Sequence, residues 1–183
     1  QNTYDVLENQ TAIGNINATD ADLDSLIYSN SGSDISISSG GVLTFVSAPD
    51  YETKTSYTTA VTVSDGVNQN TENVIIDLIN ENDNPTNFTS LATFSAAENQ
   101  SSIGTVTATD ADTQSLTFSV SGSELAITSA GVLTFVATPD YETKSSYSAT
   151  VTASDGENTG SQAISVSVID VNDNAPVFTS DAT

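Results

Sequence analysis

Carboxylate and amide side chains gather in one short stretch near the middle of the chain. The stretch is Asn80-Glu81-Asn82-Asp83-Asn84-Pro85, which follows a segment of alternating apolar residues. It contains no glycine, and Pro85 fixes its own φ and favours an extended conformation at Asn84. A stiff connector that is rich in oxygen atoms needs a partner for those oxygens. A cation is the partner that grouped carboxylates require, because they otherwise repel one another.

The chain repeats itself at a constant offset. The recurring segments are 8–10 and 98–100, 18–22 and 108–112, 49–54 and 139–144, 64–66 and 154–156, and 82–84 and 172–174. The offset is 90 residues in each case (110 − 20, 140 − 50, 173 − 83). A register that is kept over this length indicates two copies of one domain. We place the first copy at 1–84, including the junction linker, and the second at 85–183, including the C-terminal linker.

Apolar and polar residues alternate with a period of two within each copy. Near the end of the second copy, for example, Ile164, Val166 and Val168 alternate with two serines. We expect about seven short strands per copy, in the first copy at about 3–8, 13–19, 25–30, 34–38, 42–46, 56–64 and 71–80. The pattern predicts an all-β fold of two antiparallel β-sandwiches without helices.

The charge balance excludes several classes of function. The formal net charge is −22, because Lys54 and Lys144 are the only basic residues and histidine is absent. Such a charge repels nucleic acid and anionic membrane surfaces and attracts cations. Cysteine is also absent, which excludes disulfides and thiolate metal sites. Because of the charge we expect no nucleic-acid binding. No run of apolar residues is long enough to cross a bilayer, so we expect no membrane insertion.

The acidic residues recur in pairs that are separated by one residue. Asp50 and Glu52 form one such pair, and Asp110 and Asp112 form another. In extended backbone, residues at this spacing place both side chains on the same side. Ligands that offer only oxygen select a hard cation, and Ca²⁺ tolerates the irregular, high coordination of such a cluster. Each motif alone is also a common turn sequence, but their recurrence in register favours calcium.

Taken together, these motifs resemble the calcium-binding set of tandem cadherin repeats. The segments that carry the resemblance are Glu8, Asp50-Tyr51-Glu52, 80–84, Asp110-Ala111-Asp112, Asp155 and Asp170-Val171-Asn172-Asp173-Asn174-Ala175-Pro176-Val177-Phe178. The resemblance covers both copies. It implies a seven-stranded Greek-key, immunoglobulin-like β-sandwich in each copy and three calcium ions at the junction. The composition, rich in Ser, Thr and Asn and free of cysteine, is similar to that of cadherin-like repeats in large bacterial surface adhesins.

The resemblance also implies which residues bind the ions at the junction, residues 80–86. The ions nearer the first copy would use Glu8, Asp50, Glu52, Glu81, Asp83 and Asp112. The third ion would use Asn82, Asn84, Asp110, Asp112 and Asp155, with Ser123 offering a carbonyl. Asn80 belongs to the same set but stands where the second copy has Asp170, so one charged ligand is missing. We expect a complete site only here and half-sites elsewhere, formed by Asp20, Asp22, Asp65, Glu98, Asp140, Glu142, Asp170 and Asp173.

The sequence therefore favours a calcium-stiffened extender or adhesion segment of an extracellular or cell-surface protein. Its partners would be neighbouring repeats of the parent protein, with a cell-surface protein or a polysaccharide as an adhesion ligand. The alternative is a calcium-dependent carbohydrate-binding module of an adhesin or of a polysaccharide-degrading protein. An enzyme is not expected, because the carboxylates pair at ligand spacing and no His, Cys or Arg is present.

Overall fold

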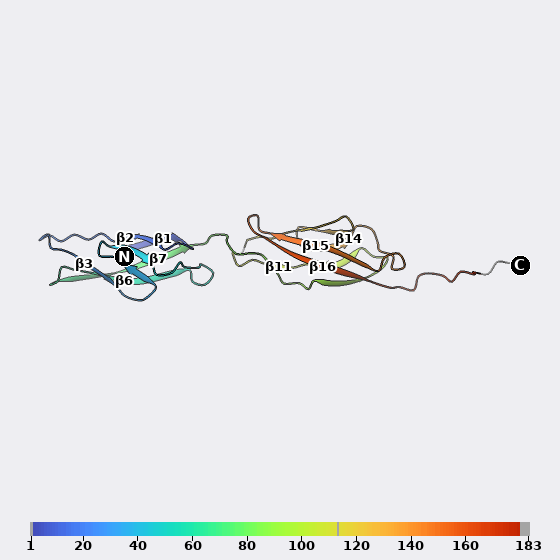
Figure 1. The fold of residues 1–183 in the computed structure, drawn as a ribbon, viewed down its shortest axis with the longest axis horizontal. Helices are drawn as coiled ribbons and strands as arrows, with labels where there is room; N and C mark the ends of the chain where they lie inside the picture. Colours follow the sequence, from blue (N-terminus) through green and yellow to red (C-terminus); the bar gives the residue numbers. More distant parts are fainter. Residues whose placement is uncertain (1, 113, 180–183) are drawn as a thin grey trace. The chain divides into compact units, whose positions relative to one another are not determined.

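A computed structural model of the chain describes residues 2–112 and 114–179. These residues form β-strands joined by turns and contain no helix, so within this part of the chain there is also no helix that could span a membrane (Figure 1). The chain divides into two compact units. Unit 1 extends to Asn82, and unit 2 begins at Asp83.

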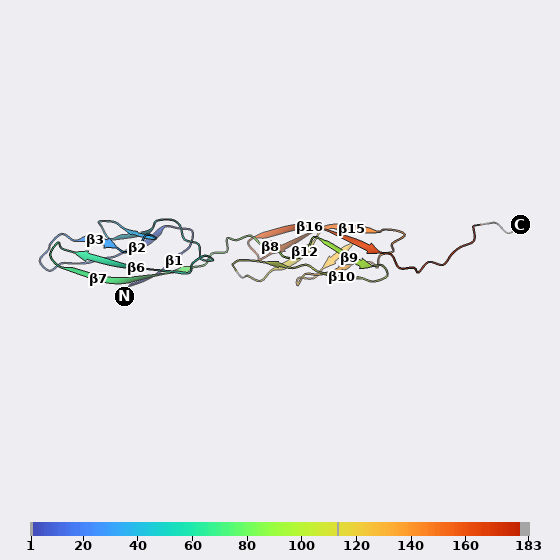
Figure 2. The ribbon, with the colours of Figure 1, turned by 90° about the horizontal axis from the view of Figure 1, so that it is seen from below.

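Unit 1 is built from two sheets that enclose one core. Its strands are β1 (Asn2–Leu7), β2 (Ala12–Asn15), β3 (Ile27–Asn30), β4 (Ile35–Ile37), β5 (Val42–Phe45), β6 (Ser56–Ser64) and β7 (Gln69–Ile79). One sheet has the order β1-β7-β6-β3 and the other the order β2-β5-β4. Figure 2 labels β1, β7, β6 and β3 of the first sheet and β2 of the second. The expected β-sandwich is confirmed.

Unit 2 repeats this arrangement and adds one short ladder. Its strands are β8 (Asn87–Phe88), β9 (Thr93–Ala97), β10 (Ser102–Thr105), β11 (Ala108–Thr109), β12 (Thr117–Val120), β13 (Leu125–Ile127), β14 (Val132–Phe135), β15 (Ser146–Ser154) and β16 (Thr159–Ile169). The sheets are β12-β15-β16-β9, β10-β14-β13 and the pair β11-β8. In unit 1 the strand expected at 13–19 ends at Asn15, so β11 has no counterpart there.

The first strand of each unit pairs in parallel with the last one. β1 runs parallel to β7, and β9 runs parallel to β16, whereas the sequence pattern predicts an antiparallel sandwich. The difference arises because alternation reports which side chains face the core and not the direction of the neighbouring strand. As a result both strands end together, with Leu7 beside Ile79. Glu8 therefore follows directly beside the stretch at residues 80–85.

The two cores occupy matching positions. In unit 1 the buried residues are Val6, Ile16, Ile35, Leu43, Phe45, Val61, Val74, Ile76 and Leu78. In unit 2 they are Ala96, Val106, Leu125, Leu133, Phe135, Val151, Ile164, Val166 and Val168, each 90 residues later (96 − 6, 168 − 78). Because each unit encloses its own apolar set, each has its own source of hydrophobic stability.

A glycine sits at the tight turn before β14. Gly131 has φ +86°, and a Cβ at this position would lie 2.2 Å from the carbonyl oxygen of Val106. Gly156 has φ +110° but open space around its missing Cβ. The two glycines therefore separate the cost of the left-handed backbone from the cost of a steric clash.

We predict that Gly131→Ala destabilises unit 2 more than Gly156→Ala does. Both substitutions force alanine into the left-handed region, at a cost of roughly 1–2 kcal/mol. Only Gly131→Ala adds a clash with backbone, so its total should reach about 3 kcal/mol. Denaturant unfolding, followed by far-UV circular dichroism, measures the unfolding midpoint of both variants. Equal shifts of the unfolding midpoint would contradict the steric argument.

Candidate metal centre

A buried glutamate closes the end of unit 1 at which β1 and β7 stop. Glu8 is only 2% exposed. Its Oε2 accepts a hydrogen bond of 2.6 Å from the backbone N–H of Tyr51, and its Oε1 accepts one of 2.8 Å from the N–H of Glu81. The carboxylate thus joins the loop after β5 to the stretch that follows β7. A buried charge is tolerated when hydrogen bonds of this kind satisfy it.

Unit 2 builds the same bridge from the equivalent residues. Glu98 is 4% exposed. It accepts hydrogen bonds from the N–H groups of Tyr141, at 2.7 Å, and of Val171, at 2.8 Å. Since the bridge forms twice from the same motif, it is a property of the repeated sequence and of each unit alone.

The acid pair of each loop is oriented by a threonine. In unit 1 the Thr53 hydroxyl donates to Asp50 at 2.8 Å, and in unit 2 the Thr143 hydroxyl donates to Asp140 at 2.9 Å. The side-chain hydrogen bond from Thr53, joined by one from its backbone N–H, lowers the pKa of Asp50 below its ordinary value. Sequence reasoning missed these threonines as site residues, although their recurrence within 49–54 and 139–144 is the signal that could have identified them.

The second acid of the pair has a different neighbour in each unit. In unit 1 the Asn80 amide donates to Glu52 Oε1 at 2.9 Å. In unit 2, carboxylate oxygens of Glu98, Glu142 and Asp170 lie within 4.8 Å of one another. A hydrogen bond from its own backbone N–H lowers the pKa of Glu142, but desolvation and the negative charges of Glu98 and Asp170 outweigh it. The net effect is a raised pKa of Glu142.

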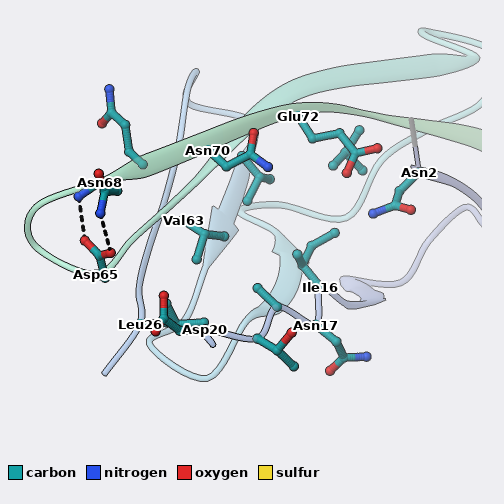
Figure 3. Close-up of a pocket in the computed structure, with 15 residues that line it drawn as sticks. Asn2, Ile16, Asn17, Asp20, Leu26, Val63, Asp65, Asn68, Asn70 and Glu72 are labelled. Carbon is teal, nitrogen blue, oxygen red and sulfur yellow. Dashed lines mark hydrogen bonds between the residues drawn. The ribbon is translucent and has the colours of Figure 1, made fainter. Parts of the chain in front are cut away.

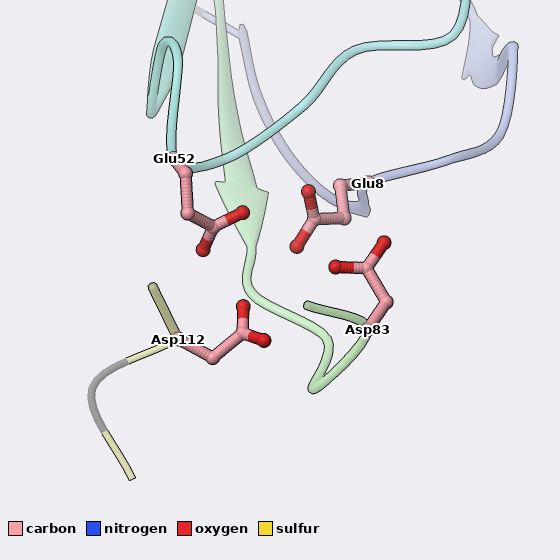
Figure 4. Close-up of side chains that lie close together, drawn as sticks. All are labelled: Glu8, Glu52, Asp83 and Asp112. Atoms are coloured by element: carbon pink, nitrogen blue, oxygen red, sulfur yellow. The ribbon is translucent and has the colours of Figure 1, made fainter. Parts of the chain in front are cut away.

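The opposite end of unit 2 gathers acids around its first residues. Asp83 and Asp112 have carboxylate oxygens within 4.8 Å of each other, and Figure 4 draws the side chains of both. The Asn84 backbone N–H donates to Asp112 Oδ2 at 2.8 Å, and its side-chain amide also donates to Asp112 and Asp83. Figure 4 also draws Glu8 and Glu52 of unit 1, whose carboxylates turn toward each other. Each unit thus presents a group of carboxylate oxygens.

Asp110, two residues before Asp112, has one carboxylate oxygen without a protein partner in the described part of the chain. Asp110 Oδ1 accepts a hydrogen bond from the N–H of Asp112, whereas Asp110 Oδ2 is buried and has no hydrogen-bond donor among the described residues. Asp155 belongs to the same predicted ligand set as Asp110. Its Oδ1 accepts hydrogen bonds from the backbone N–H groups of Glu157 and Asn158, each at 2.7 Å. A buried carboxylate oxygen without a donor is costly unless a cation satisfies it.

The corresponding end of unit 1 contains the aspartates expected to form a half-site. Asp20 Oδ1 accepts a hydrogen bond of 2.8 Å from the N–H of Asp22. Asp65 accepts hydrogen bonds from the N–H groups of Asn68, at 2.6 Å, and of Val67, at 2.7 Å. These bonds, that from Asn68 first, lower the pKa of Asp65. These hydrogen bonds hold the Asp20 and Asp65 carboxylates in place within their loops.

Lysine does not neutralise these groups. Lys54 pairs with Asp34 at 3.0 Å and lies over the ring of Tyr57, 3.9 Å from the ring centre. Lys144 pairs with Glu124 in the same way. Both bases are therefore engaged beside acids that sequence analysis did not assign to the site.

Three further residues of the predicted site have other surroundings. Ser123 is exposed in the turn between β12 and β13, and no hydrogen bond joins it to an acid in the described part of the chain. Asp173 accepts a hydrogen bond from the side chain of Asn99, which has φ +63°. Asn82 ends unit 1 and is half-buried. The assignment of these three residues as ligands stays a prediction, as does that of all the other residues predicted for the site.

Comparison with known proteins identifies the architecture. No protein-family model matches the chain. Cadherin EGF LAG seven-pass G-type receptor 1 of mouse is 30% identical over 165 residues, which cover 79% of this chain and 5% of that protein. The structure of mouse Cadherin-23 EC22-24 has a TM-score of 0.77 and 25% identity, over 93% of this chain and 62% of that one. Human Protocadherin-24 EC1-2 has a TM-score of 0.79 and 22% identity, over 92% and 94%.

The two units are cadherin-like repeats. The resemblance inferred from the motifs is confirmed, as is the all-β, immunoglobulin-like sandwich. The chain spans only 5% of the mouse receptor it matches. The bacterial origin suggested by composition is not tested by these relatives and stays a prediction.

We predict that Asp170→Asn lowers the pKa of Glu142 in the second cadherin-like repeat. The substitution removes one of the charges that raise this pKa and installs the amide that Asn80 provides in the first repeat. NMR titration of the Glu142 carboxyl in chelator measures the effect, with the exposed Asp77→Asn variant as the control.

The same shift has a consequence for stability. The pKa of Glu142 is higher in the folded state than in the unfolded state. Its protonation therefore stabilises the fold fully at a pH below the unfolded-state pKa, and this stabilisation is lost as the pH rises through the folded-state pKa. Asp170→Asn should flatten this dependence. A pKa of Glu142 that does not move in the variant would show that Asp170 is not its source.

Proposed function

We propose that the chain binds calcium at the junction of its two cadherin-like repeats and so acts as a stiffened extender or adhesion segment of an extracellular protein. The observation that carries the proposal is the buried Asp110 Oδ2, which has no donor among the described residues. The candidate ligand atoms around the junction are carboxylate and carbonyl oxygens, which suit Ca²⁺ rather than a softer metal.

Residues from both repeats would hold the ions. Repeat 1 would supply Glu8, Asp50, Glu52, Asn80, Glu81 and Asn82, and repeat 2 would supply Asp83, Asn84, Asp110, Asp112, Ser123 and Asp155. When bound, calcium supplies positive charge that offsets the repulsion among these acids. The chain's own hydrogen bonds, from Tyr51, Thr53 and Asn84, hold the carboxylates in place beforehand.

The covalent linker supports a shared site. Glu8 accepts a hydrogen bond from the N–H of Glu81, and Asp112 accepts one from the N–H of Asn84. Only three peptide units separate these two linker residues, a span of at most about 11 Å. Both groups of ligands are therefore attached to one short stretch of backbone, whatever the angle between the repeats.

Stiffening follows from sharing the ions. Each repeat encloses its own core, so calcium is not required to supply a core for either one. Ions that bind ligands of both repeats favour the arrangements in which all ligands reach them, and the equilibrium shifts toward those arrangements by mass action.

The finer points remain expectations. Neighbouring repeats of the parent protein are the expected partners, with a cell-surface protein or a polysaccharide as the adhesion ligand. The extracellular or cell-surface location, the lack of enzymatic activity and the alternative of a carbohydrate-binding module also stay predictions.

We predict that Asn80→Asp tightens calcium binding at the junction. The variant adds a carboxylate where repeat 2 has Asp170, and charge on the ligands raises the affinity of extracellular calcium modules, which commonly bind at about 10⁻⁴–10⁻³ M. We expect the weakest step to tighten by roughly three- to tenfold. Calorimetry measures it. Asn73→Asp adds the same charge at an exposed position of β7 and is the matched control. Unchanged or weaker binding would mean that Asn80 is not a ligand.

We predict that calcium lengthens the chain in solution without creating its fold. Small-angle scattering should give a larger maximum dimension in millimolar calcium than in chelator, because repulsion and a free linker allow bending when the ions are removed. Far-UV circular dichroism should keep its β signal in both conditions. Equal dimensions would exclude the stiffening role, and loss of the β signal would mean that calcium is needed for folding itself.

A further inference from the structure

An Asp-Gly bond lies in the turn that joins the last two strands of each unit. The two bonds are Asp65-Gly66, between β6 and β7, and Asp155-Gly156, between β15 and β16. The sequence contains no other Asp-Gly bond and no Asn-Gly bond. Because glycine carries no side chain, its nitrogen is the least hindered one that can follow an aspartate. At these two bonds, therefore, a backbone nitrogen and the preceding carboxyl group react most readily.

The reaction rearranges the backbone and needs no reagent other than water. The glycine nitrogen attacks Cγ of the protonated aspartate carboxyl, so that an N–Cγ bond forms and a C–O bond breaks. The N–H proton and the hydroxyl leave together as water, and a cyclic succinimide remains. Water then opens the ring. Opening at Cγ restores aspartate, and opening at the backbone carbonyl leaves isoaspartate, whose backbone runs through the former side chain.

Steric contact does not restrain either glycine. Gly66 and Gly156 are exposed and have φ of +96° and +110°. A Cβ built on either one meets no heavy atom of the described chain within 4 Å. Water can therefore reach both bonds. Within the described residues, a restraint on the reaction has to come from hydrogen bonds.

A serine holds the nitrogen that would attack. In unit 1 the Gly66 N–H donates to Ser64 Oγ at 3.1 Å, and the Ser64 hydroxyl donates to the Asn68 carbonyl oxygen at 2.9 Å. Unit 2 repeats both contacts around Ser154, at 3.1 Å and 3.2 Å. Short hydroxyl side chains commonly bond nearby backbone in this way. The glycine N–H has to leave the hydroxyl before its nitrogen can approach the carboxyl.

Other donors hold the carboxyl. Asp65 Oδ1 accepts hydrogen bonds from the N–H groups of Val67, at 2.7 Å, and Asn68, at 2.6 Å. Asp65 Oδ2 accepts one from the Asn68 side-chain amide at 3.1 Å, and Figure 3 shows the bonds between these two residues. In unit 2, Asp155 Oδ1 accepts from the N–H groups of residues 157 and 158. The two groups that would react are thus bound to different partners.

We propose that Asp65-Gly66 and Asp155-Gly156 are sites of spontaneous isomerisation to isoaspartate, and that Ser64 and Ser154 slow this reaction. Each serine is a positioning residue, because it keeps the glycine N–H on its own hydroxyl and away from the carboxyl. Unfolding breaks this contact and releases the reaction. Since each turn carries the whole arrangement, the two sites react independently.

Isomerisation at Asp155 has a consequence for the proposed calcium site. Isoaspartate adds a carbon atom to the backbone and attaches the free carboxylate directly to Cα, so the carboxylate moves away from its place in the turn. Calcium binding at the junction would weaken as a result. This consequence rests on the proposed function, whereas the isomerisation does not, and measurements in chelator test the isomerisation alone.

Peptide mass spectrometry of the aged full chain, kept in chelator, tests the proposal. Fragmentation that distinguishes isoaspartate from aspartate measures the conversion at each site separately. We expect both sites to convert severalfold more slowly in the folded chain than in denaturant. Equal rates in the two states would overturn the restraint. No conversion in denaturant would overturn the assignment of the sites.

Ser64→Ala isolates the role of the serine. It removes one hydrogen bond from the Gly66 N–H, so conversion at Asp65 should rise about fivefold, the factor that corresponds to about 1 kcal/mol. Asp155 of the same molecule is the internal control and should convert at the wild-type rate. Ser64→Thr keeps the hydroxyl and should keep the slow rate. Ser56→Ala, at an exposed position at the start of β6, should change neither site. An unchanged rate at Asp65 in Ser64→Ala, or a fast rate in Ser64→Thr, would overturn the role of the hydroxyl.

Hydroxylamine gives an independent measurement, because it cleaves the chain where a succinimide has formed. The Ser64→Ala variant should release more of the fragment that ends at Asp65 than the wild-type chain does. The Ser154→Ala variant should release more of the fragment that ends at Asp155. An equal rise of both fragments in each variant would mean that the substitutions loosen the whole chain, and would overturn a restraint that is local to each turn.

Discussion

A buried carboxylate organises the end of each unit. Glu8 in unit 1 and Glu98 in unit 2 are buried, and a buried carboxylate needs hydrogen-bond donors around it. Two backbone N–H groups meet this need, one from the loop before the sixth strand and one from the residues after the last strand. The hydrogen bonds fix where the chain leaves the sandwich, and the acid pairs of the same loop are positioned as a result.

The parallel pairing of the first and last strands makes this bridge possible. Because β1 and β7 end side by side, Glu8 emerges next to the residues that follow Ile79. The arrangement collects acids at the ends of the units, while the only two lysines pair with Asp34 and Glu124 instead. Stability and charge are thereby separated: the core holds each sandwich together, and the ends carry the grouped carboxylates.

The matched core positions stay apolar in both copies although several side chains differ, as Val6 and Ala96 do, and two further differences change polar contacts outside the cores. All core positions of unit 1 recur in unit 2, but Asn80 becomes Asp170, and Asn70 becomes Gly160. The first change replaces an amide that donates to Glu52 by a charge that raises the pKa of Glu142. The second makes room for Thr86 beside β16, since a Cβ on Gly160 would lie 2.4 Å from the Thr86 carbonyl oxygen. Neither change alters an apolar side chain that supports the fold.

The sequence by itself determined the repeat, the strands and the acid motifs, because alternation and recurrence depend only on neighbours along the chain. It predicted the strands of unit 1 closely, except that β2 ends at Asn15. It did not reveal that β1 runs parallel to β7, that Thr53 orients Asp50, or that Glu8 is buried between two N–H groups. Those facts depend on which distant segments meet, and that is decided only when the two sheets pack on a common core.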